Sequence, residues 1–234
     1  ESEGVLDVDA GAFAHLTMRG PDGRTLQWAW MNEQREQAVI DAGGWAGALT
    51  VPRELSLDAR GRLELRPVAE LAQLRRAPAE LTPTGAATGV LQRFAGRHLD
   101  ISATFTLQDR HKVGLTLLCA PDDSEGTRLV FWPDARRLTI ERARSSLDAG
   151  TRRQDVHAHL ELDRGEPLRL RVLLDASVLE VYANDRLCLA TRLYPRLADS
   201  VLGTVFAEGR GQVDVQAWEM GPMLPAQRAP LRVA

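Results

Sequence analysis

The sequence has 234 residues, of which 44% are hydrophobic and 26% are charged, and its formal net charge is −3. Such a chain buries a sizeable core, as one large domain or as two smaller units. The balanced charge excludes the basic surface that nucleic acid or an anionic membrane requires, so we expect neither partner. No run approaches the roughly 18 apolar residues of a membrane span. No signal peptide opens the sequence, which slightly favours the cytoplasm over secretion but leaves the location unknown.

Short β-rich runs bounded by turn residues follow one another after residue 12. The predicted strands are Phe13–Met18, Thr25–Met31, Arg62–Arg66, Leu99–Leu107, Lys112–Cys119, Arg128–Trp132, Arg137–Arg142, Leu168–Leu174, Val178–Tyr182, Leu187–Leu193, Val201–Ala207 and Val213–Trp218. Turn residues at 21–24, 59–61 and 184–185 predict three hairpins. The chain is therefore predicted to be all-β, and the strand spacing favours a two-sheet β-sandwich over residues 85–222.

One segment has helical character. Pro67 suits a first helical position, and Val68, Leu71 and Leu74 follow at spacings of three. We expect a short connector helix and then a linker rich in proline and threonine, together spanning residues 67–84. This division leaves residues 1–66 as a separate β unit and residues 223–234 as a loosely held tail.

The two cysteines, Cys119 and Cys188, lie in apolar strand-like runs. Two cysteines are too few for a disulfide framework, so buried free thiols are favoured over a bridge.

Six segments carry a family resemblance, and the most informative is GGWAGALTVPREL at residues 43–55. The others lie at residues 8–14, 23–31, 63–75, 138–146 and 175–195. In this order they resemble glycoside hydrolase family 32, the β-fructofuranosidase group of invertases, sucrose-6-phosphate hydrolases, levanases and inulinases. The resemblance implies a retaining hydrolase that releases terminal β-D-fructofuranosyl units from sucrose or fructans without a cofactor or metal. It also implies that residues 1–66 are the end of a five-bladed catalytic β-propeller, followed by the linker helix and the sandwich.

The family's catalytic carboxylates belong to three boxes, which read tryptophan-methionine-asparagine-aspartate-proline-asparagine-glycine, arginine-aspartate-proline and glutamate-cysteine. None of them occurs in these 234 residues. We therefore expect no catalytic residue in this chain, and no activity unless an N-terminal catalytic half of the same enzyme is its partner. Trp30-Met31-Asn32-Glu33 imitates the first box, but Gln34 follows where proline belongs, so we interpret it as a strand end that turns into a polar loop.

Trp30 is the one candidate for contact with a fructose-containing saccharide, since the face of an indole ring stacks on a sugar ring. Packing in the propeller core is the alternative interpretation, and it is the favoured one. The resemblance also leaves a homo-oligomer open, because sandwiches of this family can mediate dimers.

Two other groups of polar residues have structural interpretations. His157 and His159 share one face of a predicted strand, but Asp155 and Glu161 continue the same alternation, which favours a solvent-facing surface over a metal site.

Asp122, Asp123 and Glu125 lie in a predicted turn and are interpreted as a solvated loop. Arg53 stands beside Glu54 on a predicted propeller strand, where an arginine needs a carboxylate partner to be buried. We expect Arg53 to have a structural role.

A function of a different class also remains open. The chain can be a free-standing, lectin-like carbohydrate-binding module without catalysis. Most aromatic residues of the sandwich lie at alternating positions that suit a core, which argues against this function. Within the family, the sequence distinguishes neither hydrolase from fructosyltransferase nor sucrose, sucrose 6-phosphate, inulin and levan as substrates.

Overall fold

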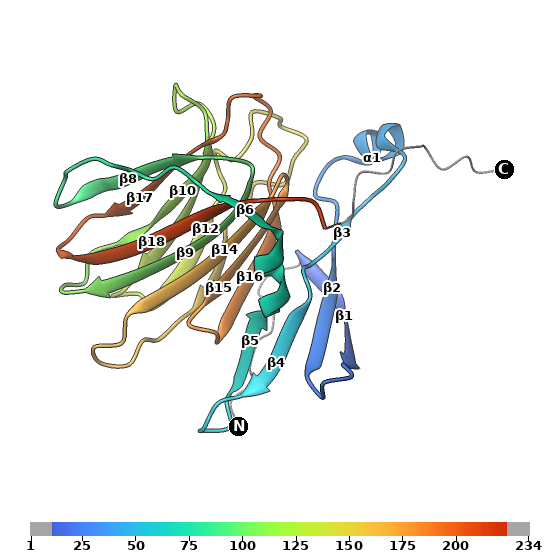
Figure 1. Cartoon of the computed structure of the whole chain (residues 1–234). Coiled ribbons are helices and arrows are strands. Elements are labelled where there is room, and N and C mark those ends of the chain that lie inside the picture. Colours follow the sequence, from blue (N-terminus) through green and yellow to red (C-terminus); the bar gives the residue numbers. More distant parts are fainter. Residues whose placement is uncertain (1–10, 224–234) are drawn as a thin grey trace.

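The computed structural model describes residues 11–223, which form three antiparallel sheets (Figure 1). The first, which we call the N-terminal sheet, has the strand order β1-β2-β4-β5, and β3 pairs with β2. Its strands are β1 (Ala12–Arg19), β2 (Thr25–Met31), β3 (Ala48–Leu49), β4 (Arg53–Leu57) and β5 (Leu63–Pro67).

The other two sheets form the sandwich. The seven-stranded sheet has the order β13-β12-β11-β10-β17-β8-β7. Its strands are β7 (Thr82–Pro83), β8 (Gly89–Ala95), β10 (Val113–Cys119), β11 (Thr127–Trp132), β12 (Arg137–Glu141), β13 (Val156–His159) and β17 (Leu202–Ala207). The six-stranded sheet has the order β16-β15-β14-β9-β18-β6. Its strands are β6 (Arg75–Pro78), β9 (His98–Leu107), β14 (Leu168–Asp175), β15 (Val178–Ala183), β16 (Leu187–Arg192) and β18 (Gly211–Met220).

The main core lies between these two sheets. In β9, the alternate residues Leu99, Ile101, Ala103 and Phe105 are at most 1% exposed, because successive side chains of a strand point to opposite faces. Most strands of both sheets contribute to this single cluster of buried apolar side chains. The prediction of an all-β chain is confirmed.

The three predicted hairpin turns are confirmed. Gly23 and Gly61, with φ of 84° and 76°, supply the left-handed conformation in the β1–β2 and β4–β5 turns. Asn184 and Asp185 adopt it in the β15–β16 turn, with φ of 49° and 56°.

The predicted connector helix is present as a 3₁₀ helix, η1 (Ala69–Leu74). Its apolar residues recur every three positions, which suits the three residues per turn of a 3₁₀ helix. Leu71 is buried in a second cluster with Val68 and Leu65, and Leu74 packs against that cluster. Pro67 is the last residue of β5 and not the first of the helix. Within the expected linker, residues 75–78 and 82–83 form β6 and β7 and pair with strands of the sandwich.

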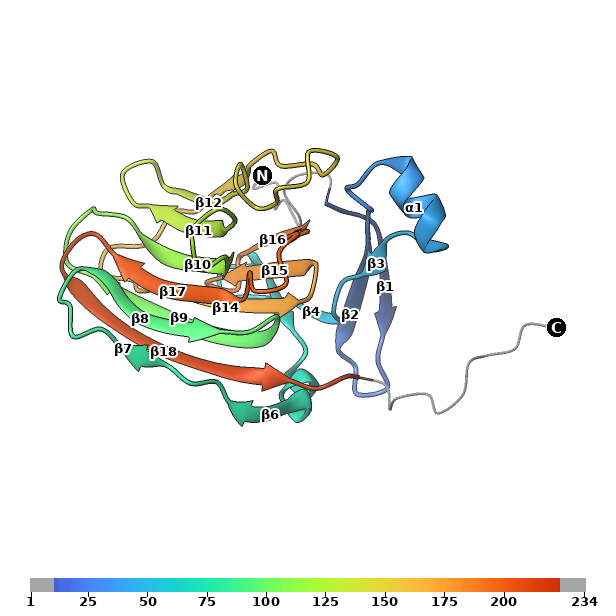
Figure 2. The same ribbon diagram turned by 90° about the horizontal axis from the view of Figure 1, so that it is seen from above.

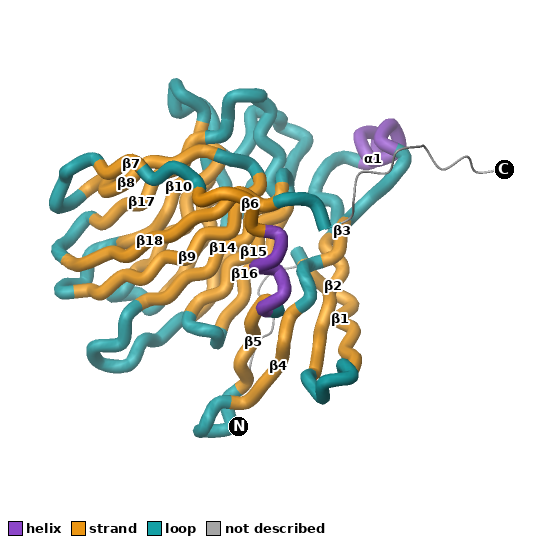
Figure 3. The backbone as a smooth tube through the Cα atoms, in the orientation of Figure 1, coloured by secondary structure: helices purple, strands orange, loops and turns teal. Residues whose placement is uncertain are grey.

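A second helix, α1 (Gln37–Gly43), was not predicted. It has no buried residue, so it carries no apolar periodicity that the sequence could reveal. Gly44 ends it in the left-handed conformation, with φ of 69°. Figure 3 shows α1 and η1 as the two helical segments of the described chain.

The N-terminal sheet lies beside the sandwich (Figure 2). One of its faces contributes Ala12, Ala29 and Met31 to a small cluster with Ala190 of β16. The second cluster joins Leu65 to Leu173, Tyr182 and Cys188 of the six-stranded sheet. No helix in residues 11–223 is long and apolar enough to cross a membrane.

Residues 8–10 of the family-like segment at residues 8–14 lie outside the described residues, and so does the predicted tail from residue 224 onward.

Candidate functional site

Trp30 lies on the face of the N-terminal sheet that points away from the Ala12–Met31 cluster. It pairs with Phe13 of β1 and with Leu49 of β3, so the three side chains form a row across the sheet. Trp30 is 38% exposed, Phe13 45% and Leu49 62%. Leu16 and Met18 extend this surface along β1 and are also exposed. We call these five residues the apolar face.

The apolar face is unusual for this molecule. Each of its five side chains is large, hydrophobic and more than a third exposed, whereas the sandwich buries nearly all of its large apolar side chains. Among residues 11–223, the strand β1 pairs with β2 alone and therefore lies at the edge of the sheet. An exposed apolar surface beside an open sheet edge is typical of a site where other protein or a ligand binds.

The loop before β3 fixes the position of Trp30. Gly47 adopts φ of +72°, and a Cβ atom on it would lie 2.2 Å from Cζ2 of Trp30. The backbone N–H of Gly47 donates to Oε2 of Glu33 at 3.2 Å. Only glycine allows the loop to pack this closely against the indole ring.

Glu33, at the end of the same segment, is a buried carboxylate, with its side chain 2% exposed. It accepts hydrogen bonds from the hydroxyl of Tyr194 and from Nε of Arg35, the latter at 2.7 Å. A nitrogen of Arg192 lies 3.6 Å from Oε2. Burial alone would raise the pKa of Glu33, but these donors outweigh it and lower the pKa below 4.5.

The segment at residues 30–34 is a strand end that turns into a polar loop, as predicted, since β2 ends at Met31. The burial of the Glu33 side chain in that loop was not predicted. Its donors Tyr194 and Arg192 come from the sandwich, more than 150 residues away, so the local sequence could not indicate them. A carboxylate that is 2% exposed and has both oxygens engaged by donors suits a structural contact and not a nucleophile, which needs open access to a sugar carbon.

Gln34 continues the contact with the sandwich. Its Oε1 accepts a hydrogen bond from Nη2 of Arg142 at 2.7 Å, and Nη1 of Arg142 donates to Oγ1 of Thr191, also at 2.7 Å. Gln34, Arg142 and Thr191 are all buried. Arg142 directly follows β12 and Thr191 lies in β16, so these bonds tie the loop after β2 to both sheets of the sandwich.

Arg53 has the expected structural role, but its partner is not Glu54. The fully buried guanidinium donates to Oε2 of Glu180 at 2.9 Å and to the hydroxyl of Tyr182 at 3.0 Å. Glu180 also accepts from the backbone N–H of Val51 at 2.7 Å. Glu54 points to the opposite face and lies near Arg24, because neighbouring residues of a strand point to opposite sides.

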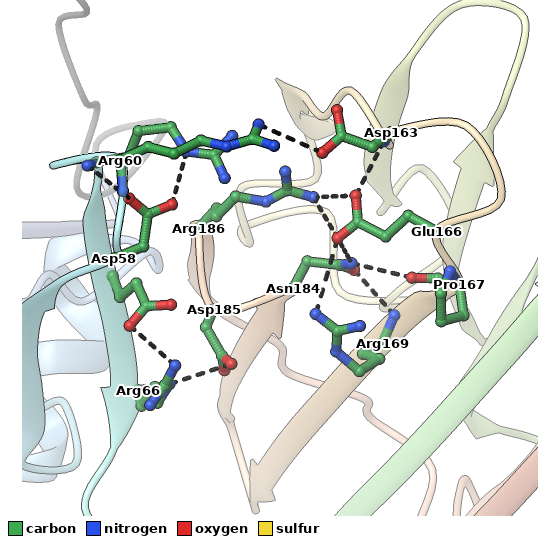
Figure 4. A network of polar contacts seen from close by, with 12 residues as sticks. Asp58, Arg60, Arg66, Asp163, Glu166, Pro167, Arg169, Asn184, Asp185 and Arg186 are labelled. Carbon is green, nitrogen blue, oxygen red and sulfur yellow. Dashed lines mark hydrogen bonds and ion pairs between the residues drawn. The ribbon is translucent and has the colours of Figure 1, made fainter.

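A third polar contact joins the β4–β5 hairpin to the sandwich (Figure 4). Nε of Arg66 lies 3.1 Å from the carboxylate of Asp185, and the backbone N–H of Leu65 donates to the carbonyl of Asp185 at 2.8 Å. Arg60 and Asp163 form a looser, exposed ion pair at 3.7 Å. These contacts place the hairpin against the β15–β16 turn.

The β15–β16 turn is itself held by Glu166 (Figure 4). Both carboxylate oxygens of Glu166 accept from Nη2 of Arg186 at 2.9 Å, and Oε1 also accepts from Nδ2 of Asn184 at 2.7 Å. Burial acts to raise the pKa of Glu166, but the hydrogen bonds prevail and lower it.

Glu125 was expected in a solvated loop, and this expectation is wrong. Asp122 and Asp123 are exposed, but Glu125 is 1% exposed. Its carboxylate accepts three backbone N–H groups and one hydroxyl, from Leu147, Arg196, Leu197 and Ser200. It therefore fixes the loop after β16, a contact between distant segments that turn chemistry does not indicate.

The remaining candidates behave as structural residues. His157 and His159 are exposed in β13 and alternate with the buried Val156 and Ala158. Within residues 11–223 no three histidine, cysteine, aspartate or glutamate side chains gather as a metal-binding group.

Neither cysteine is in a disulfide; Cys188 is buried, as predicted, whereas Cys119 is only half-buried. Burial raises the pKa of the Cys119 thiol, which disfavours its reactive thiolate form.

The aromatic residues of the sandwich offer little surface for stacking on sugars. Five of them are buried: Phe94, Phe105, Phe131, Tyr182 and Phe206. The other three have the cation of an arginine or lysine against the ring: Trp132, Tyr194 and Trp218.

Comparison with known proteins decides the family. The family model described as "Glycosyl hydrolases family 32 C terminal" matches residues 70–219, and "Glycosyl hydrolases family 32 N-terminal domain" matches residues 1–67. The chain belongs to glycoside hydrolase family 32. The N-terminal sheet is thus a part of the family's propeller, and the other two sheets are its C-terminal sandwich.

Relatives with curated names support this assignment. The chain is 32% identical to raffinose invertase of Escherichia coli over 209 residues, which are 87% of this chain and 41% of that enzyme. It is 26% identical to sucrose-6-phosphate hydrolase of the same organism, over 92% of this chain and 44% of the relative. The chain therefore spans less than half the length of these relatives.

Solved structures show the same fold. Fructan 1-exohydrolase IIa from Cichorium intybus aligns with a TM-score of 0.77 at 22% identity, over 92% of this chain and 49% of that one. Exo-inulinase from Aspergillus awamori aligns with a TM-score of 0.78 at 17% identity, over 92% of this chain and 44% of that one.

Sequence reasoning found the structural role of Arg53 but missed the acidic residues Glu33, Glu125 and Glu180 as buried anchors. A signal existed for Glu180. It stands with Tyr182 on alternate positions of an otherwise apolar strand, and a carboxylate there requires a buried cationic partner.

Proposed function

We propose that this chain is the C-terminal portion of a retaining glycoside hydrolase that releases terminal β-D-fructofuranosyl units from sucrose or fructans. The observation that carries the proposal is the apolar face. It lies on the sheet that matches the family's N-terminal model, and it has no partner among residues 11–223. Neighbouring blades of a propeller pack face to face, so the missing blades are the natural occupant of this surface.

The catalytic chemistry supports the same division. Retention requires two carboxyl groups about 5 Å apart, one as nucleophile and one as acid/base. The buried carboxylates of the described residues, Glu33, Asp100, Glu125 and Glu180, are engaged by several donors each. In our proposal both catalytic groups come from a part of the enzyme outside these 234 residues, and the chain alone is inactive.

We further propose that Trp30 lines the substrate pocket of the completed enzyme. Its indole ring is partly exposed and held in place by Gly47, so it can stack on a furanose or glucose ring at little entropic cost. Burial of Trp30 between blades is the competing role, and the two roles differ in what a mutation does to catalysis.

A chimera tests these proposals. The N-terminal part of raffinose invertase from Escherichia coli, which this chain does not cover, is fused to the chain in place of that enzyme's own C-terminal part. We expect fructose release from sucrose by the chimera and none by the 234-residue chain alone. Fructose release by the chain alone would refute the division of labour.

In that chimera, Trp30→Ala is expected to lower kcat/KM at least 10-fold with little change in thermal stability. Trp45→Ala is the matched control, since Trp45 is 57% exposed in the same region. A loss of thermal stability in Trp30→Ala without a change in kcat/KM would assign Trp30 to blade packing.

A further inference from the structure

A cavity of about 320 Å³ opens where the segment after β2 meets the turns of the sandwich. We call it the seam cavity. Its polar lining consists of Arg35, Arg97, Asp148, Ser177, Tyr194 and Arg196. Its residues come from five separate stretches of the chain, so only the folded interface between the N-terminal sheet and the sandwich creates it.

The charge of the lining is strongly positive. Three arginines and one aspartate give a net charge of +2, in a protein whose overall charge is −3. Oδ1 of Asp148 already accepts the backbone N–H of Gly150 at 2.9 Å. A cavity with this excess of guanidinium groups attracts anions and repels cations.

The arginines keep free donors while their positions are fixed. Arg35 uses Nε on Glu33, at 2.7 Å, and retains both terminal nitrogens. Arg97 uses Nη2 on the carbonyl oxygens of Leu197 and Ala198, at 2.7 and 3.2 Å. Each therefore has a partly anchored guanidinium with N–H groups left to donate.

Arg196 contributes a third guanidinium, whose side chain makes no hydrogen bond or ion pair with any described residue. Its backbone N–H is held by the buried carboxylate of Glu125 at 2.8 Å. The loop that presents Arg196 is thus ordered before any ligand arrives, which reduces the entropy lost on binding.

Ser177 adds a neutral donor. Its Oγ accepts a hydrogen bond from Nη2 of Arg192 at 2.8 Å, so the hydroxyl hydrogen remains to be donated elsewhere. Arg192 is 1% exposed, and its Nε and Nη1 find no hydrogen-bond acceptor among residues 11–223. Behind the cavity wall, Arg192 adds one positive charge and Glu33, whose Oε2 lies 3.6 Å from Arg192, adds one negative charge, so the net charge of +2 is unchanged.

We propose that the seam cavity binds a phosphate-class oxyanion, either as the free anion or as the phosphate group of a small ester. Guanidinium groups match the geometry of phosphate and sulfate oxygens and donate two parallel hydrogen bonds. The bound anion joins Arg35 of the N-terminal segment to Arg97 and Arg196 of the sandwich, so it holds the two units together. The proposal does not depend on the hydrolase function.

Isothermal titration calorimetry on the 234-residue chain tests the site, with sodium phosphate as the probe and sodium chloride at equal ionic strength as the blank. We expect saturable phosphate binding with one site per chain, and at least 10-fold weaker binding by Arg196→Ala. Arg164→Ala is the matched control, because Arg164 is an exposed arginine outside the cavity, and its affinity should match that of the wild type.

A heat signal equal to that of chloride would overturn the proposal. An equal loss of affinity in Arg196→Ala and Arg164→Ala would also overturn it, because it would indicate diffuse charge attraction. Glucose 6-phosphate and glucose form a second pair of probes. Tighter binding of glucose 6-phosphate than of phosphate identifies an ester as the ligand, and equal or weaker binding identifies the free anion. Both of these results presuppose the phosphate site.

Discussion

The buried cluster of Arg53, Glu180 and Tyr182 offers a sharp test of what holds the N-terminal sheet to the sandwich. Glu180→Gln keeps the shape of the side chain but removes the carboxylate charge that lies 2.9 Å from Nη2 of the fully buried Arg53. Removing one member of a buried ion pair costs about 3–5 kcal/mol. For a chain of this size, about 2–4 °C of Tm corresponds to each kcal/mol, so we expect Tm to fall by about 6–20 °C.

Differential scanning calorimetry measures this loss, and two further variants separate its causes. Arg110→Gln removes an ion pair whose side chains are 77% and 73% exposed, and the free energy of unfolding should change by less than about 1 kcal/mol. The double variant Arg53→Met with Glu180→Met should recover at least half of the loss, because apolar side chains replace both members of this buried ion pair. A change of less than about 1 kcal/mol in Glu180→Gln would refute the view that this cluster anchors the sheet.

Two other substitutions probe the N-terminal sheet and its contact with the sandwich, and a third probes a loop within the sandwich. Gly47→Ala forces a Cβ against the ring of Trp30 at a φ of +72°, so we expect a loss of about 1–3 kcal/mol in urea unfolding and a shift in tryptophan fluorescence. Burial and the bond to Glu33 raise the pKa of Tyr194 to about 12, from 10.0. The stabilising effect of the neutral hydroxyl is therefore complete below pH 10 and is lost as the pH rises toward 12. In urea unfolding, Tyr194→Phe should lose less stability than the wild type over that interval. Burial acts to raise the pKa of Glu125, but its hydrogen bonds outweigh burial and lower the pKa below 4.5, so its contribution to stability is present above pH 4.5 and lost at lower pH. Glu125→Gln should therefore flatten the acid limb of a plot of Tm against pH. An unchanged limb would contradict this role.

Local patterns predicted much of the fold. The alternation of apolar residues in β9, from Leu99 to Phe105, follows from burial of one face of a strand. The turn at Asn184 and Asp185 was predictable because these residues tolerate the left-handed conformation. The helix α1 was not, since a short helix with no buried residue leaves no apolar period in the sequence.

The candidate site was less predictable than the fold. Trp30 could be singled out from its residue type, but not its exposure or its contact with Gly47. The partner of Arg53 lies 127 residues away in the sequence, so the adjacent Glu54 was the only visible carboxylate. Long-range pairing decides which charges are buried, and the local pattern of a single sequence does not reveal that pairing.

Fructose release, measured on the same sample whose polypeptides are weighed by intact mass under denaturing conditions, tests most directly whether this chain depends on catalytic carboxylates from elsewhere. We predict that every sample that hydrolyses sucrose contains a further catalytic portion, joined to this chain or associated with it. A sample with only the 234-residue chain should release no fructose above the blank. Sucrose hydrolysis by that single species would contradict the proposed function and would require a catalytic pair among the carboxylates described here.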